Sequence, residues 1–423
     1  MRTALAFYRL PILLLGILFF FPVSFVMAQN ANNDSGDNGT ERIAAISVTG
    51  LRRTRLSTAE RYLRRFIGLE ANQVDADEVK AAILATGILE PLSVEIEGNV
   101  LAVAVREKWT IFPVPVMAAD SGGFSGGLAF FDANAFGLND KFFLAGFYHA
   151  DGWIASLGYI YTSRGGLAPG WSGIAAFSRA ERHDRDQNNV ILRRFEFDTI
   201  SIFGGLNFPL LKDSDLLSAS ALFSFNDKKI RNPENSLYGP DEDLRIFGAG
   251  GEFAVRKNTW DGYLLSQEAA SIRYSYRTSF SGLSFQSVQF RGLWEKSLIP
   301  GFRLNLRTGL VFEPDAPVLF ESSPNAAQVA ILPRDFSARN YAGLSAGLEK
   351  HLLSASAGTL TVAAAYQFVH SQGSILGDSF DHGCVGMLSF YLRRLAIPAV
   401  GLGVAYNVNR NYLQGSFSLG MSF

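Results

Sequence analysis

Two serines of this chain occupy the centre of a Gly-x-Ser-x-Gly segment, the arrangement that surrounds the nucleophile in many hydrolases. They are Ser125 in Gly123-Phe124-Ser125-Gly126-Gly127 and Ser345 in Gly343-Leu344-Ser345-Ala346-Gly347. A nucleophilic serine of this kind needs a sharp turn between a strand and a helix. Both segments lie instead within predicted strands of a chain that is rich in glycine. We therefore interpret the matches as chance and predict that the protein is not an enzyme. A hydrolase built on Ser125 or Ser345 is a third hypothesis.

Metal, disulfide and nucleic-acid chemistry have no support in the sequence. None of the histidines forms a pair with metal-ligand spacing, and the single Cys384 can form neither an internal disulfide nor a cysteine cluster. The net charge of −1 supplies no basic surplus for binding nucleic acid. We therefore predict no metal, no cofactor and no nucleic-acid partner.

The N-terminus indicates the compartment in which the chain works. Arg2 and Arg9 precede an apolar run from Leu10 to about Phe25, and Val26-Met27-Ala28 fits a small-residue cleavage site. This pattern predicts a secretory signal peptide over residues 1–28, followed by a polar linker over residues 29–42. The alternative is a retained membrane anchor, because the apolar run approaches spanning length.

Alternation of apolar and polar residues recurs through most of the remaining chain. Residues 302–307 place two arginines and an asparagine on one face, and residues 416–423 alternate strictly up to a final aromatic. A period of two predicts strands whose two faces meet different surroundings, as in a soluble sandwich or a membrane barrel. The predicted signal peptide and an aromatic content of 13% favour an outer-membrane barrel.

Residues 43–109 follow a different pattern. A short apolar strand is followed by two amphipathic helices, of which the first is predicted to begin with a capping box at Ser57-Thr58-Ala59-Glu60 and the second at Asp75. Two alternating strands joined by a tight turn at Gly98-Asn99 complete a β-α-α-β-β order. The sequence therefore predicts a small α/β domain before the barrel.

This domain, through Ile67-Gly68, Gly87-Ile88-Leu89 and its exit at residues 105–109, resembles a POTRA domain. POTRA domains are periplasmic and precede the barrels of the BamA/TamA superfamily, also called bacterial surface antigen proteins. Asp132-Ala133-Asn134-Ala135-Phe136-Gly137 is similar to the first hairpin of those barrels. The resemblance covers nearly the whole mature chain.

Residues 110–423 are predicted to form an all-β, 16-stranded transmembrane antiparallel β-barrel, since each spanning strand with its connection takes about 20 residues. The expected strands are residues 122–132, 140–149, 153–163, 171–180, 195–207, 216–226, 245–256, 264–276, 284–297, 301–312, 325–333, 341–352, 359–370, 382–393, 398–408 and 413–423. In this numbering the polar connections 181–193 and 226–244 follow even-numbered strands and fall on the periplasmic side, where a barrel usually has short turns.

In the superfamily, the sixth loop carries an Arg-Gly-aromatic motif whose arginine is held in the lumen by acidic groups. The matching residues are Arg334, Asp335 and Phe336. An unpaired guanidinium in a confined lumen is costly, so the resemblance implies a carboxylate partner. Three features depart from the pattern: Asp335 replaces glycine, only about seven residues separate the flanking predicted strands, and Gln367 stands where the family has an aspartate. Arg334 capping a hairpin in water is the alternative, and Arg339 is a second candidate arginine.

The superfamily also implies a lateral seam, where the first and last strands meet and a client strand is templated. We expect the first strand at residues 122–132, whose glycines weaken packing and pairing. These glycines could equally relieve crowding where the chain leaves the POTRA domain. The candidate seam residues are Gly122, Gly123, Gly126, Gly127, Phe417, Leu419, Met421 and Phe423.

The resemblance implies an outer-membrane protein, with its N-terminal domain in the periplasm, that inserts or translocates client polypeptides. The expected partners are unfolded or secreted clients and outer-membrane lipid, with periplasmic chaperones or lipoproteins as further candidates. A passive channel or structural surface barrel on the same scaffold is the alternative, favoured by the degenerate motif at residues 334–336.

Overall fold

The computed structural model describes residues 41–419 apart from short gaps. The gaps are residues 121–122, 150, 162–167, 186–189, 212–213, 234–236, 238, 241, 262–263, 334–335, 356 and 393–398. The predicted signal peptide therefore lies outside the described residues, as do Gly122, Arg334, Asp335, Met421 and Phe423.

The N-terminal module, residues 41–109, has the predicted β-α-α-β-β order. Its elements are β1 (Ala45–Thr49), α2 (Leu56–Leu63), α3 (Ala76–Leu84), β2 (Leu89–Glu97) and β3 (Val100–Glu107), with short 3₁₀ turns at Arg64–Phe66 and Ala71–Gln73. The sheet order is β1-β3-β2, with β1 parallel and β2 antiparallel to β3. Both helices bury their apolar faces on this sheet, and Leu63, Phe66, Ile83 and Leu101 are fully buried. This arrangement fits a POTRA-like domain.

The two helices of the module begin differently. At α3 the carboxylate of Asp75 accepts a hydrogen bond from the backbone N–H of Asp77 at 2.8 Å, as an N-cap should. The capping box expected for α2 is wrong: the helix begins at Leu56, and its N-cap residue Arg55 makes no side-chain cap. The hydroxyl of Thr58 is committed elsewhere, because it donates to the carbonyl of Gly137, 79 residues further along the chain.

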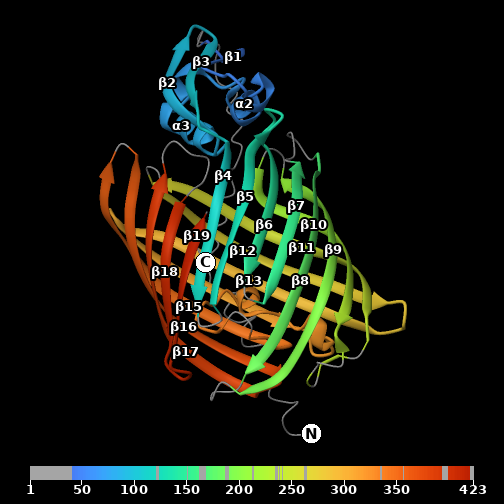
Figure 1. Cartoon of the computed structure of the whole chain (residues 1–423). Helices are drawn as coiled ribbons and strands as arrows, with labels where there is room; N and C mark the ends of the chain where they lie inside the picture. Colours follow the sequence, from blue (N-terminus) through green and yellow to red (C-terminus); the bar gives the residue numbers. More distant parts are fainter. Residues whose placement is uncertain are drawn as a thin grey trace, which may run out of the picture. The chain divides into compact units, whose positions relative to one another are not determined.

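The rest of the described chain forms one 16-stranded antiparallel sheet in which every strand pairs with its sequence neighbours, curled into a barrel (Figure 1). Its strands are β4 (Ile111–Asp120), β5 (Gly123–Ala135), β6 (Asp140–His149), β7 (Gly152–Tyr161), β8 (Gly170–Arg185), β9 (Ile191–Leu211), β10 (Ser214–Arg231), β11 (Leu244–Asp261), β12 (Leu264–Ser279), β13 (Ser284–Ile299), β14 (Phe302–Phe312), β15 (Asn340–Ala355), β16 (Gly358–Ser374), β17 (Gly377–Leu392), β18 (Ala399–Asn407) and β19 (Tyr412–Leu419).

Alternation along strands such as β15 separates an apolar outer face from a polar luminal face. On β15, Leu344 and Leu348 are about half exposed on the outside, while Ser345 and Glu349 are buried inside. Neighbouring strands repeat this pattern, as expected where lipid meets one face and the lumen the other. Among the described residues, no helix is long and apolar enough to span a bilayer. The predicted fold class, a transmembrane barrel preceded by a POTRA-like module, is confirmed.

The predicted number of strands is right, but two assignments are wrong. The first strand of the sheet is β4, which the sequence did not reveal because Pro113 and Pro115 interrupt it. Residues 325–333 form no strand, because the segment between β14 and β15 contains four prolines that cannot donate to a ladder. The shift by one strand moves the polar connections after β8 and β10 to the end of the barrel opposite the β5–β6 turn, which removes the conflict with short periplasmic turns.

Candidate functional site

The described residues of the segment 313–339, that is all but 334 and 335, connect β14 to β15 and fold into the barrel lumen; we call them the plug (Figure 1). They form two short 3₁₀ turns, Val318–Phe320 and Pro324–Ala327. The apolar side chains Val329, Ile331 and Leu332 are almost fully buried. A Cβ added to Gly343 would lie 2.4 Å from the carbonyl oxygen of Ala327, so the plug backbone packs directly on the barrel wall. The predicted strand at residues 325–333, followed by a loop of about seven residues, is therefore wrong.

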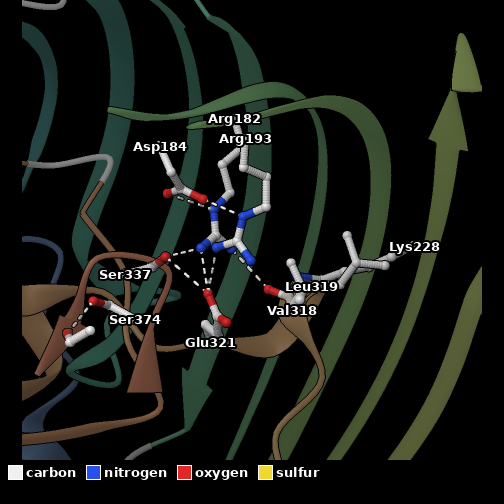
Figure 2. Close-up of polar contacts among 10 residues, drawn as sticks. Arg182, Asp184, Arg193, Lys228, Val318, Leu319, Glu321, Ser337 and Ser374 are labelled. Atoms are coloured by element: carbon white, nitrogen blue, oxygen red, sulfur yellow. Dashed lines mark hydrogen bonds and ion pairs between the residues drawn. The ribbon is translucent and has the colours of Figure 1, made fainter. Parts of the chain in front are cut away.

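On one side of the lumen, a single carboxylate holds the plug to the wall (Figure 2). Oε2 of Glu321 accepts hydrogen bonds from Arg182 of β8 at 2.5 Å and from Arg193 of β9 at 2.9 Å. Asp184 of β8 also pairs with both guanidinium groups. Ser337, at the far end of the plug, contacts both Arg182 and Glu321. We call Arg182, Arg193 and Glu321 the latch; its charges are largely buried and compensate one another, so loss of one partner would leave an uncompensated charge.

Backbone carbonyls of the plug extend the latch. Arg182 donates to the carbonyl of Val318 at 2.8 Å, and Lys228 of β10 donates to the carbonyl of Leu319 at 2.5 Å. The ammonium of Lys228 also lies 4.5 Å from the ring centroid of Phe320. Side chains from three consecutive strands, β8 to β10, therefore bind residues 318–321 of the plug.

On the other side of the lumen, uncharged amides hold the plug. Oε1 of Gln367, on β16, accepts from the backbone N–H of Ala330 at 2.8 Å. Gln414, on β19, donates to the carbonyls of Ala330 and Leu332. The plug is therefore tied directly to the last strand of the barrel.

Of the expected loop motif, Phe336 alone lies among the described residues. Phe336 is buried and packs its ring against Tyr341 and under the guanidinium of Arg410, 4.7 Å away. Arg410 in turn pairs with Asp381 of β17 at 2.8 Å. Gln367, noted for the absence of an acid, binds the plug backbone instead. Sequence reasoning missed the latch, because Glu321 is one of several acidic residues in a proline-rich segment and no local pattern distinguishes it.

The two ends of the sheet, β4 and β19, lie next to each other and form the seam. Among the described residues, no hydrogen-bonded register joins them. The expected first strand was wrong: Gly123, Gly126 and Gly127 lie on β5, which is the second strand of the sheet and lies between β4 and β6. On β19, Phe417 and Leu419 pair with β18.

The prolines of β4 bear on the seam. Alternate residues of a strand direct their N–H groups to the same side, so Pro113 and Pro115 remove two donors from one side of β4. Proline is tolerated in sheets where its missing donor faces a free edge. Since β5 pairs along the whole length of β4, we assign both missing donors to the side that faces β19.

The turn between β5 and β6 docks on the N-terminal module. The guanidinium of Arg53 forms two hydrogen bonds with the carboxylate of Asp132, at 2.6 and 3.1 Å. Asn139 donates to the hydroxyl of Tyr62 and to the carbonyl of Thr86. At Gly137, with φ of 73°, an added Cβ would lie 2.2 Å from the carbonyl of Arg53, so only glycine fits this contact.

The serine motifs have no hydrolase geometry. Ser125 lies within β5 and Ser345 within β15, and neither occupies a turn between a strand and a helix. Ser345 instead accepts a hydrogen bond from the amide of Gln367 at 3.3 Å. Within the described part of the chain, no group of histidine, cysteine and acidic side chains is arranged to hold a metal ion.

Comparison with solved structures supports the fold. CdiB from Escherichia coli is 13% identical, with 90% of this chain and 76% of CdiB covered, at a TM-score of 0.63. CdiB from Acinetobacter baumannii is 14% identical, with 90% and 74% covered, at a TM-score of 0.57. At identities this low, the comparison shows a shared fold alone. No family model and no curated protein matches the chain. The comparison therefore supports the fold that the sequence predicts, a barrel preceded by a small N-terminal module.

Proposed function

We propose that this protein inserts or translocates client polypeptides at the outer membrane, through capture by the N-terminal module and pairing of a client strand at the seam. The observation that carries the proposal is a barrel whose first and last strands are adjacent but joined by no ladder among the described residues. BamA and CdiB act on client polypeptides at the outer membrane, and the shared fold makes the same class of activity the first choice here.

The chemistry of the seam favours opening. A closed barrel has no free edge, because all its strands are paired. Here Pro113 and Pro115 remove donors from β4, so fewer hydrogen bonds must break before a client can enter. An unpaired N–H or C=O group inside a membrane is costly, and an extended client segment would satisfy the remaining groups.

The module offers edges for capture. Both β1 and β2 are edge strands of its three-stranded sheet, since β3 lies between them. An extended client segment can add to such an edge through main-chain hydrogen bonds. The contact between Arg53 and Asp132 keeps this sheet close to the start of β4 and the end of β5.

The alternative, a passive channel, is disfavoured by the plug. Residues 313–339 bind the inner faces of β8 to β10 on one side and of β16 and β19 on the other. These contacts hold the plug across the lumen, which disfavours a wide and steadily open pore. The catalytic alternative has no site among the described residues, because both candidate serines lie within strands.

The test is to lock the seam reversibly. Cysteine pairs would be scanned across Ile111–Asp120 and Tyr412–Leu419 in a Cys384→Ala background, and client assembly followed with and without oxidant. The control pair replaces Ala176 and Ser201, which already face each other across the β8–β9 ladder. Oxidation should stop assembly in the seam variants alone, and reductant should restore it. Normal assembly by a fully oxidised seam would refute lateral opening.

A further inference from the structure

Positive charge in the N-terminal module is concentrated in one stretch of the chain. Residues 42–65 contain seven arginines and one acidic residue, whereas residues 66–109 contain three basic and eight acidic residues. The module as a whole is therefore close to neutral, but its charge is separated into a basic part and an acidic part. A basic surface of this kind attracts anionic partners.

Two of these arginines, Arg52 and Arg55, lie on a loop whose backbone is fixed at both ends. The carboxylate of Glu107 accepts hydrogen bonds from the backbone N–H groups of residues 52–54, and the N–H of Arg55 donates to the carbonyl of Gly137 at 2.9 Å. The side chains of Arg52 and Arg55 are exposed, and neither forms a hydrogen bond or ion pair with the described residues. The loop therefore presents two guanidinium groups beside the turn that joins β5 to β6.

The β5–β6 turn also carries an exposed aromatic side chain. Phe136 is 70% exposed, and its φ of 57° is a left-handed conformation that is uncommon for a bulky residue. Its ring centroid lies 6.2 Å from that of Tyr159 on β7, and the ring centroid of Tyr159 lies 5.3 Å from that of Trp171 on β8. We call these three residues the aromatic cluster.

The strand residues of the aromatic cluster lie on the outer face of the barrel. Trp171 is an odd number of positions from Arg182, whose side chain reaches the plug in the lumen, so Trp171 points to the opposite side of β8. Tyr159 pairs with Gly173, which shares the face of Trp171. Aromatic side chains on the outer face near the ends of strands are typical of the membrane–water interface. The lipid headgroups are therefore expected at the level of the β5–β6 turn.

Apolar side chains of the module accompany the two arginines. Leu56, the first residue of α2, follows Arg55 directly and is 48% exposed. Trp109 is 66% exposed, and it precedes Thr110, whose hydroxyl accepts a hydrogen bond from Arg53. Arginines combined with exposed leucine and aromatic side chains are typical of segments that bind at the surface of an anionic membrane.

We propose that Arg52 and Arg55 bind the phosphate groups of anionic phospholipids in the membrane leaflet on the module's side. A planar guanidinium donates two N–H groups to two phosphate oxygens, and the fixed loop holds both arginines ready for this contact. Leu56 and Phe136 reach the boundary between the headgroups and the acyl chains. The bound lipid holds the module against the membrane next to the barrel. This inference goes beyond the proposed function and does not depend on how a client enters.

The test measures which phospholipid gathers around the module. The full chain, with a bimane fluorophore at Ser57→Cys in a Cys384→Ala background, is placed in phosphatidylcholine nanodiscs. A small fraction of phosphatidylglycerol with a spin label on its acyl chain is added, or the same fraction of phosphatidylcholine with the same label. Ser57 is exposed in the first turn of α2, so the spin label of a nearby lipid quenches the fluorophore. Phosphatidylglycerol should quench at least about fivefold more strongly than phosphatidylcholine.

Two double variants locate the site. Arg52→Gln with Arg55→Gln should bring the ratio of the two quenching constants to within about twofold of one. The control, Arg42→Gln with Arg64→Gln, removes the same charge from exposed arginines away from the β5–β6 turn. Arg42 lies near Asn99 at the far end of the module's sheet, and Arg64 follows the last residue of α2. The control should keep the ratio of the unmodified protein.

Equal quenching by the two lipids in the unmodified protein would overturn the inference. An equal loss of the ratio in both double variants would also overturn it, because the charge of the whole module would then attract the lipid. So would displacement of phosphatidylglycerol by a soluble polyglutamate peptide, because the arginines would then take an acidic polypeptide. No client takes part in this measurement, so its failure is distinguishable from failure of the proposed function.

Discussion

Replacing Glu321 with glutamine tests whether the latch holds the plug. The side chains of Glu321 and Arg193 are 3% and 5% exposed, so the carboxylate meets two guanidinium groups away from water. Removing one partner of such a buried pair costs about 3–5 kcal/mol. Asp184 still compensates the arginines when the plug leaves, so most of this loss falls on the closed state. At about 1.4 kcal/mol for each factor of ten, release of the plug should become at least about 100-fold more frequent.

The assay follows a cysteine that only an open plug exposes. The cysteine is introduced by Val329→Cys in a Cys384→Ala background. The side chain of Val329 is 3% exposed, and cysteine is smaller than the valine it replaces. A water-soluble maleimide should label it at a rate proportional to the open population when opening is fast. The control is Asp198→Asn, which breaks an ion pair with Arg179 on the same two strands without touching the plug. Labelling of the Glu321→Gln protein no faster than of this control would refute the latch.

Three further predictions concern the seam and the module. The double variant Pro113→Val, Pro115→Val should restore two N–H donors to β4, stabilise the barrel by about 0.5–1.5 kcal/mol for each new hydrogen bond, and slow client assembly. Heat-modifiability on gels measures the stability of the barrel. Unchanged melting and unchanged assembly would count against our assignment of the seam edge. Burial alone would raise the pKa of Glu107, but hydrogen bonds from the backbone of residues 52–54 outweigh it and hold that pKa below 4.5. The ionised carboxylate of Glu107 therefore stabilises the module above pH 4.5, and this effect is lost as pH falls through the lowered pKa. The difference in melting temperature between the unmodified protein and Glu107→Gln should shrink on acidification. A difference that is independent of pH would contradict this prediction. Arg53→Ala should weaken docking of the module by about 1–3 kcal/mol and speed limited proteolysis near residue 109. The control Arg106→Ala breaks an ion pair inside the module and should not change the rate of proteolysis. Equal rates of proteolysis for the two variants would refute the docking role of Arg53.

The architecture could be predicted from the sequence because the alternation within a strand shows which side chains face outward and which face the lumen. Leu344 and Leu348 alternate with Ser345 and Glu349 within one strand, so the two faces can be read locally. The amphipathic helices of the module are equally local. The strand β4 escaped detection because Pro113 and Pro115 are normally a signal against a strand, and they are tolerated here on an edge that has no ladder among the described residues.

The candidate site was much less predictable, because its contacts join distant segments. Arg182 and Glu321 are separated by 139 residues, and Arg53 and Asp132 by 79. No periodicity or motif relates such pairs. The resemblance directed attention to the correct loop through Phe336, but the plug is held by Glu321, Gln367 and Gln414, which the superfamily's arginine motif does not indicate.

The central claim is that client strands pair at the seam, and site-specific photocrosslinking during assembly tests it most directly. A benzophenone amino acid would be placed in turn at each position of Ile111–Asp120 and Tyr412–Leu419, and at Ser218–Phe225 of β10 as a fully paired control. A stalled client should crosslink to β4 and β19 with a period of two residues and not to β10. Crosslinks that are absent from both seam strands, or equally frequent at β10, would contradict the account.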